Sequence, residues 1–161
     1  MSGGNGLFKP TGNITREQVV TTLYNLEKSP KVDDYSAVDA FKDVAAGEWY
    51  VEAVSWAFNT GVAQGNPQTK MFGVGTPITR EQLVTMLYNY SEKKGYDVET
   101  RGDYSDLADE DAVSTWYVDA MKWGYGVGLI GGNGKLNPQG YTTRAQMASM
   151  MKQFNENVVQ E

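Results

Sequence analysis

The 161-residue chain contains no cysteine and no histidine. Their absence excludes disulfide bonds, thiol nucleophiles, imidazole bases and the commonest zinc ligands. Glycoside hydrolysis requires a placed pair of carboxylates, and the 20 acidic residues of the chain form no recognisable catalytic constellation. We therefore expect no catalytic residue, no metal site and no cofactor, and a protein that is not an enzyme.

Positive charge and long apolar runs are also lacking. The net charge of −6 argues against general binding of nucleic acid or other polyanions. No apolar run approaches the roughly 18 residues of a membrane-spanning helix. Met1 to Gly4 has neither the charged start nor the apolar stretch of a signal peptide. We expect no nucleic-acid partner and no membrane insertion, and the 40% apolar content supports one compact domain or closely packed repeats.

Arginine is scarce, yet it recurs at a constant period. Three of the four arginines lie in the related stretches Thr-Arg-Glu-Gln, Thr-Arg-Glu-Gln and Thr-Arg-Ala-Gln. The three are Arg16, Arg80 and Arg144, each 64 residues from the next, and the fourth is Arg101. A fixed period of this length indicates an array of structural repeats.

Each copy of this motif predicts the start of a helix. A Thr followed three residues later by Gln is a capping box, and apolar residues follow at helical spacing. The apolar positions are Val19, Leu23 and Leu26; Leu83, Met86, Leu87 and Tyr90; and Met147, Met150, Met151 and Phe154.

The arginine is then the first helical residue, where the helix dipole disfavours a cation by about 0.3–1 kcal/mol. Two explanations remain open. Each arginine either pairs with a nearby carboxylate, or joins the free helix N–H groups in binding an external carboxylate or phosphate.

A second repeated feature is a helix led by tryptophan. Residues 49–56 match residues 116–123, and the tryptophans within each stretch are seven residues apart. This spacing predicts that Trp49 and Trp56, and likewise Trp116 and Trp123, share one helical face. Trp56 and Trp123 favour core packing, whereas Trp49 and Trp116 could line a groove. Gly61 and Gly128 follow as predicted helix ends.

Turns complete the repeat, because glycine and asparagine tolerate left-handed backbone angles. The turns are Gly4-Asn5, Gly65-Asn66 and Gly132-Asn133. We expect residues 1–161 to form a single module, with a partial first repeat over 1–30 that lacks the tryptophan helix. The second repeat covers 41–98 and the third covers 104–158.

The combination of Phe-x-Asp, a tryptophan-led helix, a glycine turn and Ile-Thr-Arg-Glu resembles the S-layer homology (SLH) domain. The hallmark of that family usually reads Thr-Arg-Ala-Glu, and the resemblance covers about Gly4 to Val158. It implies a mainly α-helical fold, with tandem repeats around a pseudo-threefold axis and the capped helices in a central three-helix bundle. It also implies an extracellular function, the non-covalent anchoring of a bacterial surface protein to a secondary cell-wall polysaccharide that is often pyruvylated.

The resemblance further implies where ligand binds, in grooves between neighbouring repeats. Arg16, Arg80 and Arg144 match the arginines that meet the ligand carboxylate. Asp43 and Asp106 match the acid of Phe-x-Asp and are expected to hydrogen-bond sugar hydroxyls. The remaining candidates are Trp49, Trp116 and the turn residues Gly65, Asn66, Gly132 and Asn133.

Two departures from the family pattern support an alternative. The final Glu of the motif is Gln in all three copies, and the first tryptophan helix is missing. A protein-interaction or assembly module that self-associates, with the same fold but no glycan binding, is therefore the competing hypothesis.

Overall fold

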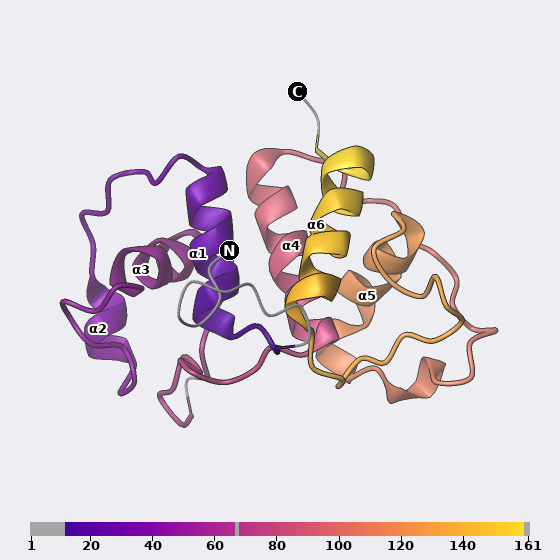
Figure 1. Ribbon diagram of the computed structural model, residues 1–161, viewed down its shortest axis with the longest axis horizontal. Helices are drawn as coiled ribbons and strands as arrows, with labels where there is room; N and C mark the ends of the chain where they lie inside the picture. Colours follow the sequence, from indigo (N-terminus) through magenta and orange to yellow (C-terminus); the bar gives the residue numbers. More distant parts are fainter. Residues whose placement is uncertain (1–11, 67, 160–161) are drawn as a thin grey trace. The chain divides into compact units, whose positions relative to one another are not determined.

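The computed structural model describes residues 12–66 and 68–159, and the regular structure over this range is helical (Figure 1). Strand pairing among these residues is limited to isolated bridges. The elements in chain order are α1 (Arg16–Leu26), α2 (Ser36–Ala40), α3 (Val51–Thr60), α4 (Arg80–Lys94), the 3₁₀ turns η2 (Glu110–Ala112) and η3 (Thr115–Tyr117), α5 (Val118–Gly126) and α6 (Arg144–Asn157). The predicted mainly α-helical fold class is confirmed, and the pseudo-threefold axis stays a prediction. No helix in the described range is long and apolar enough to cross a bilayer.

The chain forms two compact units that do not coincide with the sequence repeats. Among the described residues, the first unit contains residues 15–66 and 68–77, and the second contains residues 12–14 and 78–159. In the first unit α3 packs on α1 and α2, and in the second α5 packs on α4 and η3. Each unit therefore joins the capped helix of one repeat to the tryptophan helix and loop of the next.

The three capped helices begin where the motif predicts. In α4 and α6 the capping box is complete: Thr79 and Thr143 accept the N–H of Gln82 and Gln146 at 3.3 and 3.1 Å, and each Gln accepts the Thr N–H in return. At α1, Gln18 Oε1 accepts the Thr15 N–H at 2.9 Å. The two residues form the capping-box arrangement, but Thr15 Oγ1 accepts no hydrogen bond from the described part of the chain.

The apolar stripes of these helices build the cores. All but two of the predicted stripe positions are buried. Leu26, the last residue of α1, is 51% exposed, and Met151 is half-buried. The helical period thus identifies the buried face and fails at positions on its edge or at a helix end.

The prediction that both tryptophans of a pair share one helical face is wrong. Trp56 and Trp123 are 6% and 0% exposed, as expected for core residues, while Trp49 and Trp116 are 64% and 78% exposed. The reason is local: α3 begins only at Val51, and Trp116 lies in the 3₁₀ turn η3 before α5. The 3.6-residue period does not apply to a residue that precedes the helix.

Gly61 ends α3 as predicted, with a φ of +80° in the left-handed region, where glycine carries no Cβ penalty. Gly128, with a φ of +86°, follows the end of α5. The predicted Gly4-Asn5 turn lies outside the described residues.

Candidate functional site

In both units a loop of the next repeat crosses the first turn of a capped helix. The Arg16 N–H donates to Thr76 O at 3.1 Å, and the Arg80 N–H donates to Gly140 O at 3.0 Å. Antiparallel bridges join Thr15 to Pro77 and Thr79 to Tyr141. Each of these two motif arginines therefore starts its helix against backbone from the following repeat.

Arg16 is bonded to its own chain. Its Nε donates to Phe72 O at 2.9 Å and its Nη2 donates to Gln64 O at 3.0 Å. The guanidinium also lies over the Phe72 ring, 5.1 Å from the centroid, within the range of a cation–π contact. Arg16 thus fastens α1 to the loop of the second repeat.

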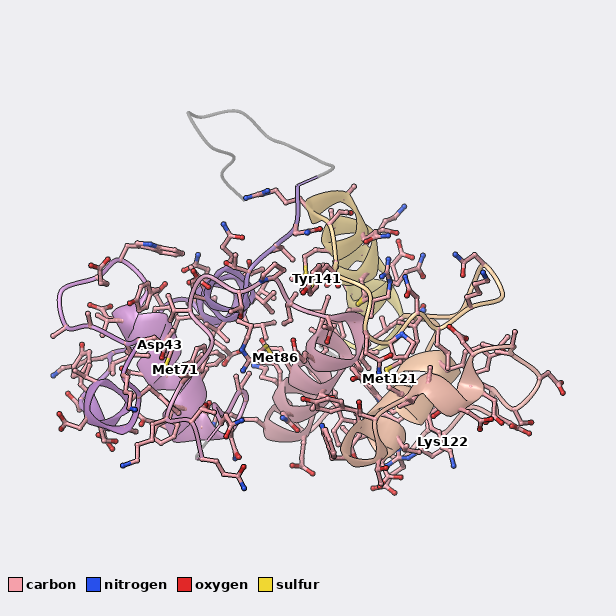
Figure 2. The ribbon with its side chains drawn as sticks, turned by 90° about the horizontal axis from the view of Figure 1, so that it is seen from below. Asp43, Met71, Met86, Met121, Lys122 and Tyr141 are labelled. Atoms are coloured by element: carbon pink, nitrogen blue, oxygen red, sulfur yellow. The ribbon has the colours of Figure 1, made fainter. Side chains whose placement is uncertain are left out.

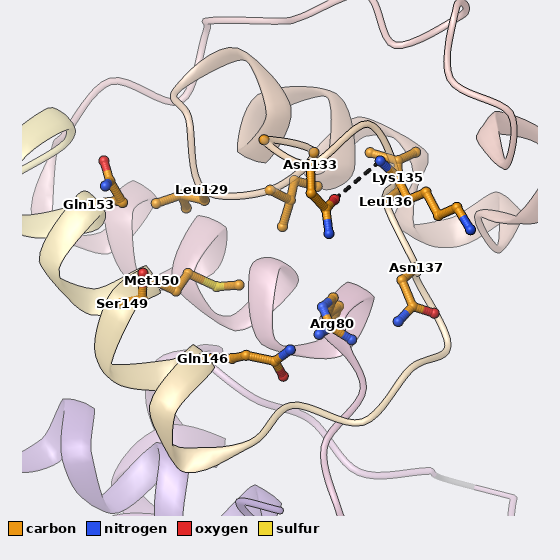
Figure 3. A pocket seen from close by; sticks show the side chains of 13 residues that line it. Arg80, Leu129, Asn133, Lys135, Leu136, Asn137, Gln146, Ser149, Met150 and Gln153 are labelled. Carbon is orange, nitrogen blue, oxygen red and sulfur yellow. Dashed lines mark hydrogen bonds between the residues drawn. The ribbon is translucent and has the colours of Figure 1, made fainter. Parts of the chain in front are cut away.

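Arg80 instead lies in a cavity of about 220 Å³ within the second unit (Figure 3). Residues of α6 and of the loop after α5 form its walls, and the side chain of Arg80 lies between Gln146 and Asn137. The lining residues are Arg80, Leu129, Ile130, Gly131, Gly132, Asn133, Lys135, Leu136, Asn137, Gln146, Ser149, Met150 and Gln153. The cavity thus combines one arginine, one lysine, several amides and an apolar patch.

The electrostatics of this cavity favour an anion. None of its described lining residues is acidic. Among the described contacts, the one hydrogen bond that the Arg80 guanidinium donates is long, 3.4 Å from Nη1 to Tyr141 O. Burial lowers the pKa of Arg80, but an arginine remains charged at neutral pH. A half-buried cation with so little internal pairing is best satisfied by an external carboxylate or phosphate.

Arg144 begins α6 in the same register. Its N–H donates to Gly12 O at 2.9 Å. Its Nε is buried and makes no hydrogen bond to the part of the chain that the structure describes. The three motif arginines are therefore not equivalent, and Arg80 is the one that lines the cavity.

Asp43, expected to bind sugar hydroxyls, holds a loop of its own repeat. Its carboxylate accepts the N–H groups of Phe72, Gly73 and Val74, each at 2.8 Å. Figure 2 shows it beside Met71, the residue before this loop. Three of its lone-pair sites are thus occupied by backbone.

In the third repeat the equivalent acid is Asp109 rather than Asp106. Asp109 accepts the N–H groups of Leu136 and Asn137 at 3.0 and 2.8 Å, which lie 64 residues after Phe72 and Gly73. Asp106 is exposed. The match of Asp106 to Asp43 is wrong because the segment before Trp116 differs in length and includes the η2 turn.

Two of the four predicted turn residues in the described range line the cavity, and the other two have structural roles. Gly132 and Asn133 line the cavity, where the Asn133 side chain accepts the Lys135 N–H at 3.2 Å. Gly65 is instead a packing glycine, since a Cβ there would lie 2.3 Å from the Phe41 ring. Asn66 caps its own turn by accepting the N–H groups of Gln68 and Thr69.

Trp49 and Trp116 do not line the described cavity. Each makes an edge-on contact with the tyrosine that follows it, Tyr50 or Tyr117. The structure therefore brings together Arg80, Gly132 and Asn133 from the predicted set. The other predicted residues lie elsewhere.

Sequence reasoning missed several residues of the cavity wall. The motif predicts only a capping role for Gln146, and Ser149 and Gln153 lie one and two turns further along α6. Their spacing of three to four residues places them on one helical face. This spacing was the available signal, because it marks a polar stripe that starts at the motif.

The two loop-holding carboxylates predict a loss of stability in acid. Burial tends to raise the pKa of Asp43, but its three backbone N–H bonds lower it by more. The N–H bond from Leu136 is the main cause that lowers the pKa of Asp109. Since both folded-state values lie below the unfolded value of about 3.9, their stabilisation is complete above about pH 4 and is lost as the pH falls through the lowered pKa.

Urea unfolding followed from pH 7 to pH 2.5 measures this loss. We expect the urea concentration at the midpoint of unfolding to decrease once the pH is lowered below about 4. The decrease should be less steep in Asp43→Asn, which has no carboxylate left to protonate at this position. Identical pH profiles for the two proteins would contradict the assignment.

Comparison with known proteins agrees with the repeat pattern. The S-layer homology domain family matches residues 1–20, 40–84 and 107–148, more than half of the chain. This chain belongs to the S-layer homology domain family. The family match and the surface-layer relative described below indicate an extracellular location at the cell surface or cell wall.

Relatives of this SLH chain contain a similar segment as a small part of a larger protein. It is 30% identical over 159 residues to the surface-layer 125 kDa protein of Lysinibacillus sphaericus, which covers 96% of this chain and 13% of that protein. It is 31% identical over 152 residues to an endoglucanase of Bacillus sp. (strain KSM-635), and the alignment covers 89% of this chain and 15% of the endoglucanase. It is 24% identical over 146 residues to the amylopullulanase of Thermoanaerobacterium thermosulfurigenes, and the alignment covers 89% of this chain and 8% of the amylopullulanase. The chain thus spans less than a sixth of each of these three relatives.

Proposed function

We propose that this SLH chain is a non-catalytic module that anchors a surface protein to a cell-wall polysaccharide. In this proposal the cavity around Arg80 binds an acidic substituent of the polysaccharide, such as a pyruvyl ketal. The observation that carries the proposal is the half-buried Arg80 guanidinium in a cavity without acidic lining among the described residues.

The chemistry of the cavity matches a carboxylate on a sugar. A guanidinium holds a carboxylate through two parallel N–H···O bonds. The amides of Asn133, Asn137 and Gln146 can exchange hydrogen bonds with hydroxyls, and Leu129 and Met150 offer apolar contact to C–H groups. A volume of about 220 Å³ is below the roughly 300–1,000 Å³ of drug-sized sites, so it fits one substituted sugar rather than a buried oligosaccharide.

The relatives support an anchoring role. A surface-layer protein, an endoglucanase and an amylopullulanase differ in the activity that their names describe, yet each contains a segment similar to this one. A segment common to proteins with different activities is best explained by a shared task such as attachment. The enzyme names describe whole proteins of which the aligned part is at most 15%.

Co-sedimentation with purified cell walls of the producing organism tests the proposal. We expect the protein to sediment with intact walls and to remain in solution once the secondary polysaccharide has been extracted. Mild acid, which cleaves ketals, should remove binding to the isolated polysaccharide if the acidic substituent is a pyruvyl ketal.

Two results would contradict the proposal. Unchanged sedimentation after extraction would show that the wall partner is not the polysaccharide. Absence of wall binding, together with concentration-dependent association in sedimentation velocity, would favour the assembly module instead.

A further inference from the structure

The residue after Arg80 is a buried carboxylate. Glu81 is 4% exposed. It accepts hydrogen bonds from Ser114 N at 3.1 Å and Ser114 Oγ at 2.7 Å, and from Gln139 Nε2 at 3.2 Å to both oxygens. A buried carboxylate is costly unless it is paired, and these neutral donors supply that pairing. Glu81 thus joins two separate loops of the third repeat at the start of α4.

One of these loops is a wall of the Arg80 cavity. Asn137 lines the cavity, and the Glu81 N–H donates to Pro138 O at 3.0 Å. At Gly140 an added Cβ would come within 2.7 Å of Arg80 Nη1, and Tyr141 O accepts the Arg80 hydrogen bond. Residues 137–141 therefore confine the guanidinium, and Gln139, the residue that Glu81 holds, is at their centre.

The first unit contains the same device. Glu17 is 7% exposed and accepts the Gly75 N–H at 2.9 and 3.0 Å. Gly75 lies 64 residues before Gln139, as Glu17 does before Glu81. The third copy has Ala145 at this position. A carboxylate that follows the motif arginine thus holds the loop of the next repeat in both units.

We infer that Glu81 is a positioning residue for ligand binding by this chain. Its carboxylate fixes the 137–141 wall, and the wall fixes the orientation of the Arg80 guanidinium in the cavity. The consequence for affinity rests on the proposed function, whereas the consequence for the Arg80 side chain does not. A guanidinium held in one orientation loses less side-chain entropy on binding and therefore binds more tightly.

The test has two readouts, one without ligand and one with it. The chain has four arginines, so the ¹⁵N spectrum of the arginine Nε–H groups is simple, and Arg80→Lys identifies the Arg80 signal. In Glu81→Ala we expect this signal to shift or broaden while that of Arg101 stays in place. Affinity for the purified, ketal-bearing polysaccharide should fall about tenfold, the size expected for one lost hydrogen bond. Gln139→Ala should shift or broaden the same signal, because it breaks the hydrogen bonds that join the 137–141 wall to the Glu81 carboxylate.

Trp123→Phe is the matched control for instability. It removes the hydrogen bond from Trp123 Nε1 to Asp97 O in the core of the same unit, and Trp123 does not line the cavity. We expect it to lower the urea midpoint without moving the Arg80 signal or the affinity. An unmoved Arg80 signal in folded Glu81→Ala and Gln139→Ala, or a Trp123→Phe variant that moves it equally, would overturn the inference. The Arg80 signal could move in Glu81→Ala while an Arg80 variant still binds the polysaccharide normally. That pair of results would uphold Glu81 as the residue that positions Arg80 and would reject the proposed function.

Discussion

Arg80→Ala is expected to weaken binding to the acidic polysaccharide about 100-fold and to leave the stability of the domain almost unchanged. Hydrogen bonds to charged groups contribute about 1.5–3 kcal/mol each, and one lost bidentate pair in a half-buried site is therefore worth about 3 kcal/mol, or two orders of magnitude in Kd. Stability is spared because, among the described contacts, the guanidinium gives its own chain one hydrogen bond of 3.4 Å. Calorimetric titration with polysaccharide fragments and urea unfolding measure the two effects.

Two variants separate geometry from charge in this experiment. Lys152 is exposed on α6 and does not line the cavity, so Lys152→Ala removes the same charge and should bind normally. Arg80→Lys keeps the charge without the planar fork and should recover only part of the affinity. Equal losses in Lys152→Ala and Arg80→Ala would mean that the net charge of the domain, rather than the cavity, determines binding.

Local signals in the sequence predicted the helices well. Three capping boxes, at Thr15, Thr79 and Thr143, mark the observed starts of the capped helices. The apolar period identifies most of the core, and Trp56 and Trp123 are buried as expected. These features depend on neighbours within a few residues, which is why a pattern in the chain is enough to predict them.

Features that depend on contacts distant in sequence were not predictable. The capped helix of one repeat packs with the tryptophan helix of the next, so the compact units cut across the repeat boundaries. The motif period treats Arg16 and Arg80 alike, although one donates to Gln64 O and Phe72 O and the other lines a cavity. Nor does the motif show that Glu81 would meet Ser114 and Gln139, 33 and 58 residues away.

In α1 and α4 the residue after the motif arginine makes that arginine tolerable at the first helical position. The cation is unfavourable next to the helix N-terminus, but in α1 and α4 it is followed at once by a buried glutamate, Glu17 or Glu81. A carboxylate in the first turn interacts favourably with the same helix charge. The unfavourable arginine and the favourable glutamate therefore offset one another locally.

Arg16→Ala is expected to have the opposite effect to Arg80→Ala: a loss of stability with unchanged affinity. The substitution removes the hydrogen bonds to Phe72 O and Gln64 O and the contact with the Phe72 ring. Phe72 itself is 2% exposed, so its carbonyl is left without this partner in a place with little access to water. A loss of about 2–4 kcal/mol in the free energy of unfolding follows from two charge-assisted bonds, one part-buried and one exposed.

The measurements for Arg16→Ala are urea unfolding and the same calorimetric titration. Arg16→Lys should recover only a small part of the stability, because an ammonium cannot donate in the directions of both Nε and Nη2. A variant that unfolds like the parent protein but has lost affinity would reverse the assignment and make Arg16 a ligand contact. The expected pair of results, stability lost at Arg16 and affinity lost at Arg80, would show that one repeated motif has been used for two purposes: Arg16 holds neighbouring repeats together, and Arg80 binds the wall.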